Sequence, residues 1–164
     1  YGPRQSLSNP YTGLCSIFST QIVNKKQPVI YEDGNQTRDF VFVEDVAAAN
    51  LFVMHNKKVE GSVFNVGSGV PTSINTFAQT LIDLYDSTLQ PNITGEFRLG
   101  DSRHLFADIH KLQSIGFEPK HSLKTGLKKY TEWIMQQNNI TDYVSKTQSE
   151  LKSAQIIRQQ RKVK

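Results

Sequence analysis

One short apolar segment limits what this chain can fold into. Residues 62–69 read SVFNVGSG, an apolar run that is closed by glycines. Such a run is typical of a strand that is buried on both faces of a parallel sheet. A doubly wound sheet needs several strands of this kind, and the rest of the sequence offers few of them. We therefore expect a chain that contributes to a parallel sheet but lacks most of the strands of that sheet.

Strand-like and helix-like patterns alternate along the 164 residues, which predicts the α/β class. β-Branched and aromatic residues predict short strands within residues 28–31 and 37–43, and a strand followed by a loop over 95–104. Apolar residues at helical spacing predict five helices, within residues 10–26, 44–56, 73–85, 107–117 and 122–137. Ser73 is expected to cap the third of these helices and Gly116 to end the fourth.

Composition and charge divide the chain into two parts. The apolar content of 37% and the charged content of 21% suit a globular domain, which we expect over residues 1–140. Residues 1–141 carry 13 basic and 13 acidic side chains, whereas residues 142–164 carry six basic and two acidic ones. The net charge of +4 therefore belongs to a basic polar tail at 141–164, whose composition is compatible with a helix. We expect no nucleic-acid-binding face on the domain.

The cellular setting is constrained by two absences in the sequence. No run approaches the ~18 apolar residues that a membrane-spanning helix requires, so no membrane association is expected. Cys15 is the only cysteine and cannot form an internal disulfide, which favours a reducing, cytoplasmic location. It lies on the apolar side of its predicted helix and is expected to be a small buried side chain.

Three arginines are the candidate ligand-binding residues. Arg38 lies in a predicted strand, and Arg98 and Arg103 flank a Gly-Asp loop. The planar guanidinium group donates two hydrogen bonds to phosphate oxygens, so three such groups in one place would suit a diphosphate. Spacing alone leaves open that they form ordinary surface ion pairs with Asp39, Asp101 or Asp108.

The sequence contains no self-sufficient catalytic set. The segment NVGSG at residues 65–69 lacks the spacing of a dinucleotide-binding turn, and no Lys-Ser or Lys-Thr pair follows it as in a P-loop. No tyrosine is followed four positions later by a lysine. The histidines do not have the spacing of metal ligands, so no metal site is expected.

Several segments, in order, resemble the C-terminal half of the nucleotide-sugar epimerase/dehydratase family. They are YGPRQ, IYEDGNQTRDFVFVEDVA, FNVGSG and FRLGDSRHLFADIHKLQSIGFEPKHSLKTGLKKYTEWI, and they extend from residue 1 to about 136. The family comprises the extended short-chain dehydrogenases/reductases, and UDP-glucose 4-epimerase-like enzymes are the most similar in style. The resemblance implies the fold of the C-terminal substrate-binding lobe, without most of the Rossmann sheet.

The resemblance also implies roles for individual residues. In the family, the arginine of the RDF segment and the arginine and aspartate of the R-x-G-D loop contact the diphosphate and ribose, which implies Arg38, Arg98 and Asp101. Arg103 is implied as a second phosphate-binding or a structural arginine. Contacts with the uracil or the nucleotide are implied for three apolar or aromatic residues, Val29, Tyr31 and Ile74.

The implied function is the UDP-sugar-binding portion of an NAD-dependent 4-epimerase or dehydratase. In such enzymes a Gly-rich turn binds NAD and a Tyr-x-x-x-Lys pair is catalytic; both lie in the other half, so this chain alone is expected to bind no cofactor and to be inactive. The alternative is a stand-alone, non-catalytic nucleotide-sugar-binding module. Family members are often homodimers, and the unpaired strand at 62–69 predicts marginal stability alone or association with a partner.

Overall fold

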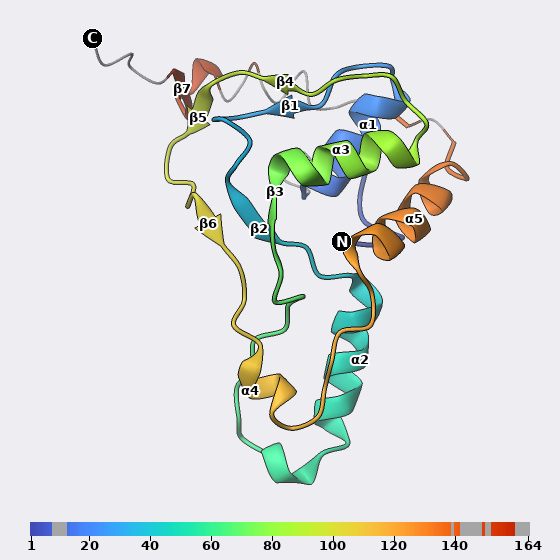
Figure 1. Ribbon diagram of the computed structural model, residues 1–164, viewed down its shortest axis with the longest axis vertical. Helices are drawn as coiled ribbons and strands as arrows, with labels where there is room; N and C mark the ends of the chain where they lie inside the picture. The colour runs from blue at the N-terminus through green and yellow to red at the C-terminus, as the bar shows by residue number, and fades with distance from the viewer. Residues whose placement is uncertain (8–12, 139, 142–148, 150–151, 160–164) are drawn as a thin grey trace.

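The computed structural model describes residues 1–7, 13–138, 140–141, 149 and 152–159. The molecule is elongated, with a helical lobe at one end and an arm at the other (Figure 1). The lobe holds α1 (Leu14–Val23), α3 (Ile74–Leu84) and α5 (Leu123–Ile134), and the arm holds α2 (Val43–Met54), the 3₁₀ turn η1 (Lys57–Val59) and α4 (His110–Gln113). None of the helices described here is long and apolar enough to cross a membrane.

The main core lies between the three helices of the lobe. Phe18, Phe77, Leu81, Leu127 and Tyr130 are each 0% exposed there. The polar residues of α3 and α5 face outward, so each helix has one apolar side that must be covered. Both helices begin at a serine that caps them, because the hydroxyls of Ser73 and Ser122 accept hydrogen bonds from backbone amides three residues later. The predicted cap at Ser73 is thus confirmed.

The strands are short and form three small sheets. β1 (Val29–Ile30) pairs in parallel with β4 (Asn92–Ile93). β2 (Thr37–Asp39) lies between antiparallel β3 (Pro71–Ser73) and parallel β6 (His104–Leu105). β5 (Glu96–Arg98) pairs antiparallel with β7 (Ile157–Gln159). The α/β class predicted from the alternating patterns is confirmed, and the part of the chain described here contains no wide parallel sheet.

The arm is attached to the lobe by a buried carboxylate. Asp45, in the first turn of α2, is 2% exposed. Its carboxylate accepts hydrogen bonds from the backbone amides of Lys120 and His121, each at 3.0 Å, and lies 2.9 Å from Nδ1 of the His121 imidazole. The segment that leads into α5 is therefore fixed against the start of α2.

The strand predicted within residues 62–69 is not formed. These residues have no strand partner in the described structure, and Val63 is 82% exposed. A strand needs a neighbouring strand to satisfy its backbone amides and carbonyls. Among the described residues the segment is held by side chains instead: Nζ of Lys111 donates to the Val63 carbonyl at 2.8 Å, and Nδ2 of Asn65 donates to the Asp108 carbonyl at 3.2 Å. The predicted helix over 107–117 is also shorter, because only His110–Gln113 is helical before Gly116 reverses the chain with φ +97°.

Candidate functional site

Arg38 is held in place by one nitrogen of its guanidinium group. It is the middle residue of β2 and aligns with Leu105 of β6. Its Nη1 donates to the carbonyl oxygens of Thr37 at 2.8 Å and Arg103 at 3.1 Å. Within the residues that the structure describes, Nη2 and Nε have no hydrogen bond or ion pair. The group is therefore anchored and still has donors available for a ligand.

Arg103 is engaged by an acidic turn. Its guanidinium pairs with the carboxylates of Glu32 and Asp33, the latter at 2.7 Å. Hydrogen bonds from Arg103 hold the pKa of Asp33 well below the usual range of an aspartate. Arg103 is thus held by two carboxylates of its own chain. The alternative pairing of the three arginines with other acids is not formed among the described residues Asp39, Asp101 and Asp108.

The acidic turn at residues 31–35 connects the other elements of this region. Gly34 has φ +76°, and a side chain there would collide with the amide of Asn75. The backbone amide of Asn75, in α3, donates to the Gly34 carbonyl at 3.0 Å. On the other side, the backbone amide of Glu32 donates to the Glu96 carbonyl at 2.6 Å. The turn therefore links α3 to β5, the strand that carries Arg98.

The Arg98 side chain is exposed and unpaired among the described residues. Arg98 ends β5, is exposed, and has no hydrogen bond or ion pair from its side chain to any described residue. The chain then turns at Gly100, which has φ +88°, and the Asp101 amide donates back to the Arg98 carbonyl at 3.3 Å. The exposed Asp101 carboxylate likewise has no described partner. One tight loop thus presents a free guanidinium group and a free carboxylate together.

The apolar and aromatic candidates are partly or fully buried. Val29 in β1 and Tyr31 just after it are half-buried, and the Tyr31 carbonyl accepts a hydrogen bond from Nε2 of Gln36 at 2.9 Å. Ile74 is only 3% exposed and belongs to the main core, so it supports the start of α3. The implied contacts of these three residues with a nucleotide stay predictions.

The glycine-containing loop at residues 66–69 binds a carboxylate of the same chain. The Asp39 side chain accepts hydrogen bonds from the Ser68 amide at 2.7 Å, the Ser68 hydroxyl at 2.6 Å, the Gly69 amide at 3.1 Å and the Ala107 amide at 3.2 Å. A side chain at Gly67 would collide with Asp39 and Ala107. The sequence analysis did not predict that Asp39 accepts hydrogen bonds from this loop. The signal in the sequence was an aspartate next to Arg38, together with a loop of small residues whose amides need an acceptor.

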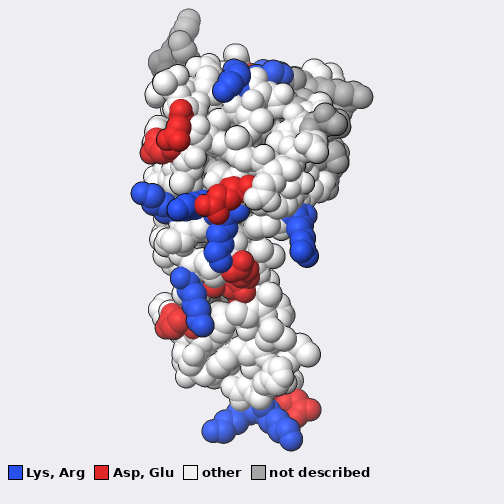
Figure 2. Space-filling view, turned by 90° about the vertical axis from the view of Figure 1, so that its right-hand side faces the viewer, with Lys and Arg blue, Asp and Glu red and all other residues white. Residues whose placement is uncertain are grey.

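The face that carries α2 and α5 has charges of both signs. Figure 2 shows basic and acidic side chains mixed there, with broad uncharged areas between them. Lys129 of α5 pairs with Glu44 of α2 at 2.7 Å, and Nε2 of His121 lies 3.3 Å from the same carboxylate. These pairs add to the Asp45 attachment between the arm and the lobe.

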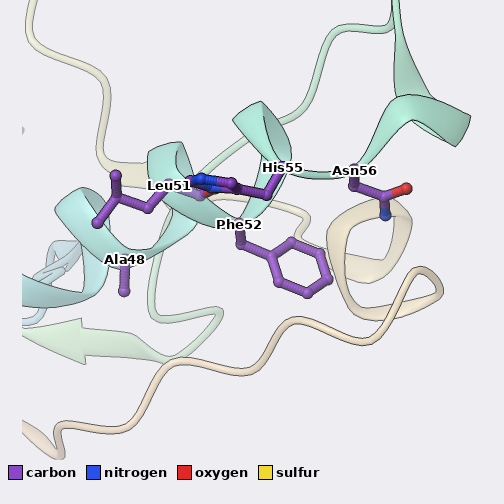
Figure 3. A pocket seen from close by; sticks show the side chains of 5 residues that line it. All are labelled: Ala48, Leu51, Phe52, His55 and Asn56. Carbon is purple, nitrogen blue, oxygen red and sulfur yellow. The ribbon is translucent and has the colours of Figure 1, made fainter.

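A shallow apolar hollow lies on α2, lined by Ala48, Leu51, Phe52, His55 and Asn56 (Figure 3). Leu51 is 56% exposed. Nδ1 of His55 lies 2.7 Å from the Leu51 carbonyl, so its imidazole is turned back onto its own helix. The lining residues do not bring several polar groups together, so the hollow is a poor candidate for a catalytic site. Its exposed apolar side chains suit contact with another polypeptide surface.

Comparison with known proteins places these features in a class of enzyme. Residues 1–67 match the model of the NAD dependent epimerase/dehydratase family. The fold matches solved structures of 4-epimerases of the extended short-chain dehydrogenase type. The resemblance predicted from the sequence is confirmed: residues 1–67 match the model of the NAD dependent epimerase/dehydratase family, and most of the chain is similar to 4-epimerases.

Three of the similar proteins are 4-epimerases that act on nucleotide sugars, by their names. The chain is 41% identical over 138 residues to the dTDP-L-rhamnose 4-epimerase of Burkholderia thailandensis, which covers 84% of this chain and 38% of that protein. It is 32% identical, with a TM-score of 0.77, to a UDP-N-acetylglucosamine 4-epimerase of Methanobrevibacter ruminantium solved with UDP-N-acetylmuramic acid; the match covers 84% of this chain and 44% of the other. The UDP-glucose 4-epimerase of Thermotoga maritima, solved with UDP-glucose, is 35% identical with a TM-score of 0.73, over 82% of this chain and 43% of the other.

The chain spans well under half the length of these relatives, between 38% and 44%. It therefore corresponds to a portion of such a protein. The ligands and activities in the names of these relatives belong to the whole proteins.

Proposed function

We propose that this chain is the substrate-binding portion of an NAD-dependent nucleotide-sugar 4-epimerase. The observation that carries the proposal is Arg98, an exposed guanidinium group with no partner among the described residues. Its strand is hydrogen-bonded to the acidic turn, and the same turn pairs with Arg103, whose carbonyl accepts from Arg38. The relatives quoted above are all named 4-epimerases, which favours epimerisation over dehydration. Both UDP- and dTDP-sugars occur in their names, and we take a UDP-sugar as the substrate class.

The residues divide the work of holding the ligand. Arg98 and Arg38 donate hydrogen bonds to the diphosphate, each charge-assisted contact being worth roughly 1.5–3 kcal/mol. Asp101 accepts from a ribose hydroxyl, and Val29 and Tyr31 contact the base. Arg103 does not touch the diphosphate in this proposal; its ion pairs with Glu32 and Asp33 keep its carbonyl in place to hold Arg38.

The glycine-containing loop at residues 66–69 binds a carboxylate of this chain: the Ser68 and Gly69 amides donate to Asp39. A dinucleotide phosphate would have to displace that carboxylate. The family uses NAD to oxidise and then reduce the sugar. We therefore assign the binding of NAD to a part of the enzyme outside these residues.

The exposed apolar surface of the arm supports a larger enzyme. Leu51, Met54 and Val63 are 56%, 77% and 82% exposed. Burying each such side chain stabilises a protein by roughly 1.5–3 kcal/mol, so we assign this surface to contact with the NAD-binding half.

Homodimerisation, a role in carbohydrate metabolism and a cytoplasmic location are part of the same proposal. Burial raises the pKa of the Cys15 thiol, which is consistent with a cysteine kept reduced.

The alternative is a stand-alone, non-catalytic nucleotide-sugar-binding module. One observation favours it: α1, α3 and α5 bury a main core within this chain, and the acidic turn that pairs with Arg103 is hydrogen-bonded to α3. Binding of UDP by the isolated chain, with an affinity equal to that of the complete enzyme, would support this reading.

The test is UDP affinity, measured by isothermal titration calorimetry on the complete enzyme. Arg98→Ala and Arg38→Ala are each expected to weaken UDP binding at least about tenfold, because each removes a charge-assisted contact. Lys58→Ala is the control, since it removes an exposed cation on η1 at the far end of the arm. Unchanged UDP affinity in both arginine variants would contradict the assignment of Arg98 and Arg38 to the diphosphate. A parallel titration with dTDP shows which base the enzyme prefers.

A further inference from the structure

Strand β7 lies along the edge of the strand that carries Arg98. The register aligns Arg98 with Ile157, Phe97 with Arg158 and Glu96 with Gln159. The ladder continues one residue further, because the Leu99 amide donates to the Ile156 carbonyl at 2.9 Å. The tail, expected from the sequence to be a polar appendage, therefore reaches the candidate site (Figure 1).

β5 has little other support at its Arg98 end. Its inner edge touches the acidic turn through two backbone hydrogen bonds, from Glu32 to the Glu96 carbonyl and from Gly95 to the Glu32 carbonyl. Both lie at the start of the strand. Among the described residues, the backbone hydrogen bonds of Arg98 and Leu99 are with the tail and with Asp101 of their own loop. Without β7, the end of β5 would be an unpaired strand edge.

Two side chains attach the tail at this position. Ile157, which lies opposite Arg98, is 7% exposed, whereas its neighbour Ile156 is 37% exposed. Directly opposed residues of an antiparallel pair project from the same face, so the Ile157 and Arg98 side chains lie on the same face of the pair. Nζ of Lys152 lies 2.8 Å from the Glu96 carboxylate and ties the turn before β7 to the start of β5.

We propose that β7 is a positioning strand for Arg98, with Ile157 as its anchor, and that it sets the affinity of the enzyme for the nucleotide diphosphate. This inference rests on the proposed function of Arg98. A guanidinium group on an unpaired loop must be ordered when the ligand binds, and ordering costs affinity. Pairing with β7 orders the backbone in advance, so the tail strengthens binding without touching the ligand.

The experiment is a double-mutant cycle on the complete enzyme, with UDP affinity measured by calorimetry. The proteins are the unsubstituted enzyme, Ile157→Asp, Arg98→Ala and the double variant. Ile157→Asp is expected to weaken UDP binding about tenfold, and to have no further effect when Arg98 is already alanine. Ile156→Asp is the matched control, because it places the same charge on the neighbouring, more exposed residue and should leave affinity unchanged.

Each outcome has one meaning. Unchanged affinity in Ile157→Asp, or an equal loss with and without Arg98, overturns the positioning role. If Arg98→Ala itself binds UDP normally, the proposed function of Arg98 fails first, and the inference with it. Thermal melting checks that each variant is folded. Ile157→Ala replaces Ile157→Asp if the aspartate prevents folding, with a smaller loss that must again vanish in the Arg98→Ala background.

Discussion

At the scale of single residues, Asp39 contributes more to stability than its half-exposed position suggests. Its carboxylate, on β2, accepts four hydrogen bonds from two other segments, residues 68–69 and residue 107. Removing it leaves three backbone amides without an acceptor. Such amides are costly to leave unpaired when they are shielded from water.

We therefore expect Asp39→Ala to lower the free energy of unfolding by about 2–4 kcal/mol. Urea denaturation of the complete enzyme measures this value. Asp101→Ala provides the comparison, because its carboxylate has no partner among the described residues, and its effect on stability should be within about 0.5 kcal/mol. Equal stabilities of the two variants would contradict the role given to Asp39.

At the scale of elements, the attachment of α2 to the segment before α5 depends on an ionised carboxylate. Burial raises the pKa of Asp45, but the hydrogen bonds from Lys120 and His121 outweigh it and leave the pKa below the ordinary value. A depressed pKa in the folded state means that the stabilisation is present above the pKa of the unfolded chain. It is lost as the pH falls through the lower, folded value.

Asp45→Asn is therefore expected to cost about 2–4 kcal/mol at pH 7, and the difference from the unsubstituted enzyme should shrink below about pH 4. Urea denaturation at several pH values between 7 and 2.5 gives the two curves. Asp83→Asn, on the exposed side of α3, should follow the unsubstituted curve. A difference that stays constant down to pH 2.5 would show that ionisation of Asp45 is not the cause.

The helices could be predicted from the sequence and the sheets only in part. α3 and α5 have an apolar side and a serine cap, which are local signals, so their positions were found closely. β4, β6 and β7 are two or three residues long and depend on distant partners, so no local pattern revealed them. For the candidate site, the sequence pointed to Arg38, Arg98 and Arg103 alike, and these assignments stay predictions. The pairing of Arg103 with Glu32 and Asp33 depends on segments distant in sequence, so no local pattern indicated it.

At the scale of the whole molecule, the chain has a complete core at one end and an uncovered apolar surface at the other. Residues 62–69 have the composition of a buried strand but no strand partner among the described residues. If the NAD-binding half of the enzyme supplies that partner, the backbone amides of residues 63–66 become hydrogen-bonded in the complete enzyme.

Hydrogen exchange followed by mass spectrometry tests this expectation. Amides at residues 63–66 should exchange at least about tenfold more slowly in the complete enzyme than in the isolated chain. Amides of α1 at residues 18–22, which lie in the main core, should exchange at similar rates in both. Equally fast exchange at 63–66 in the two proteins would mean that this segment does not pair with the rest of the enzyme.

The carboxylate of Asp39 also has a consequence for the order in which the chain folds. Its partners lie 29, 30 and 68 residues away along the sequence. Contacts between such distant segments require large loops to close, and closure is opposed by chain entropy until the surrounding structure has formed. We therefore expect the three segments to join late in folding, after the helical lobe has formed, and the hydrogen bonds of Asp39 to act mainly by slowing unfolding.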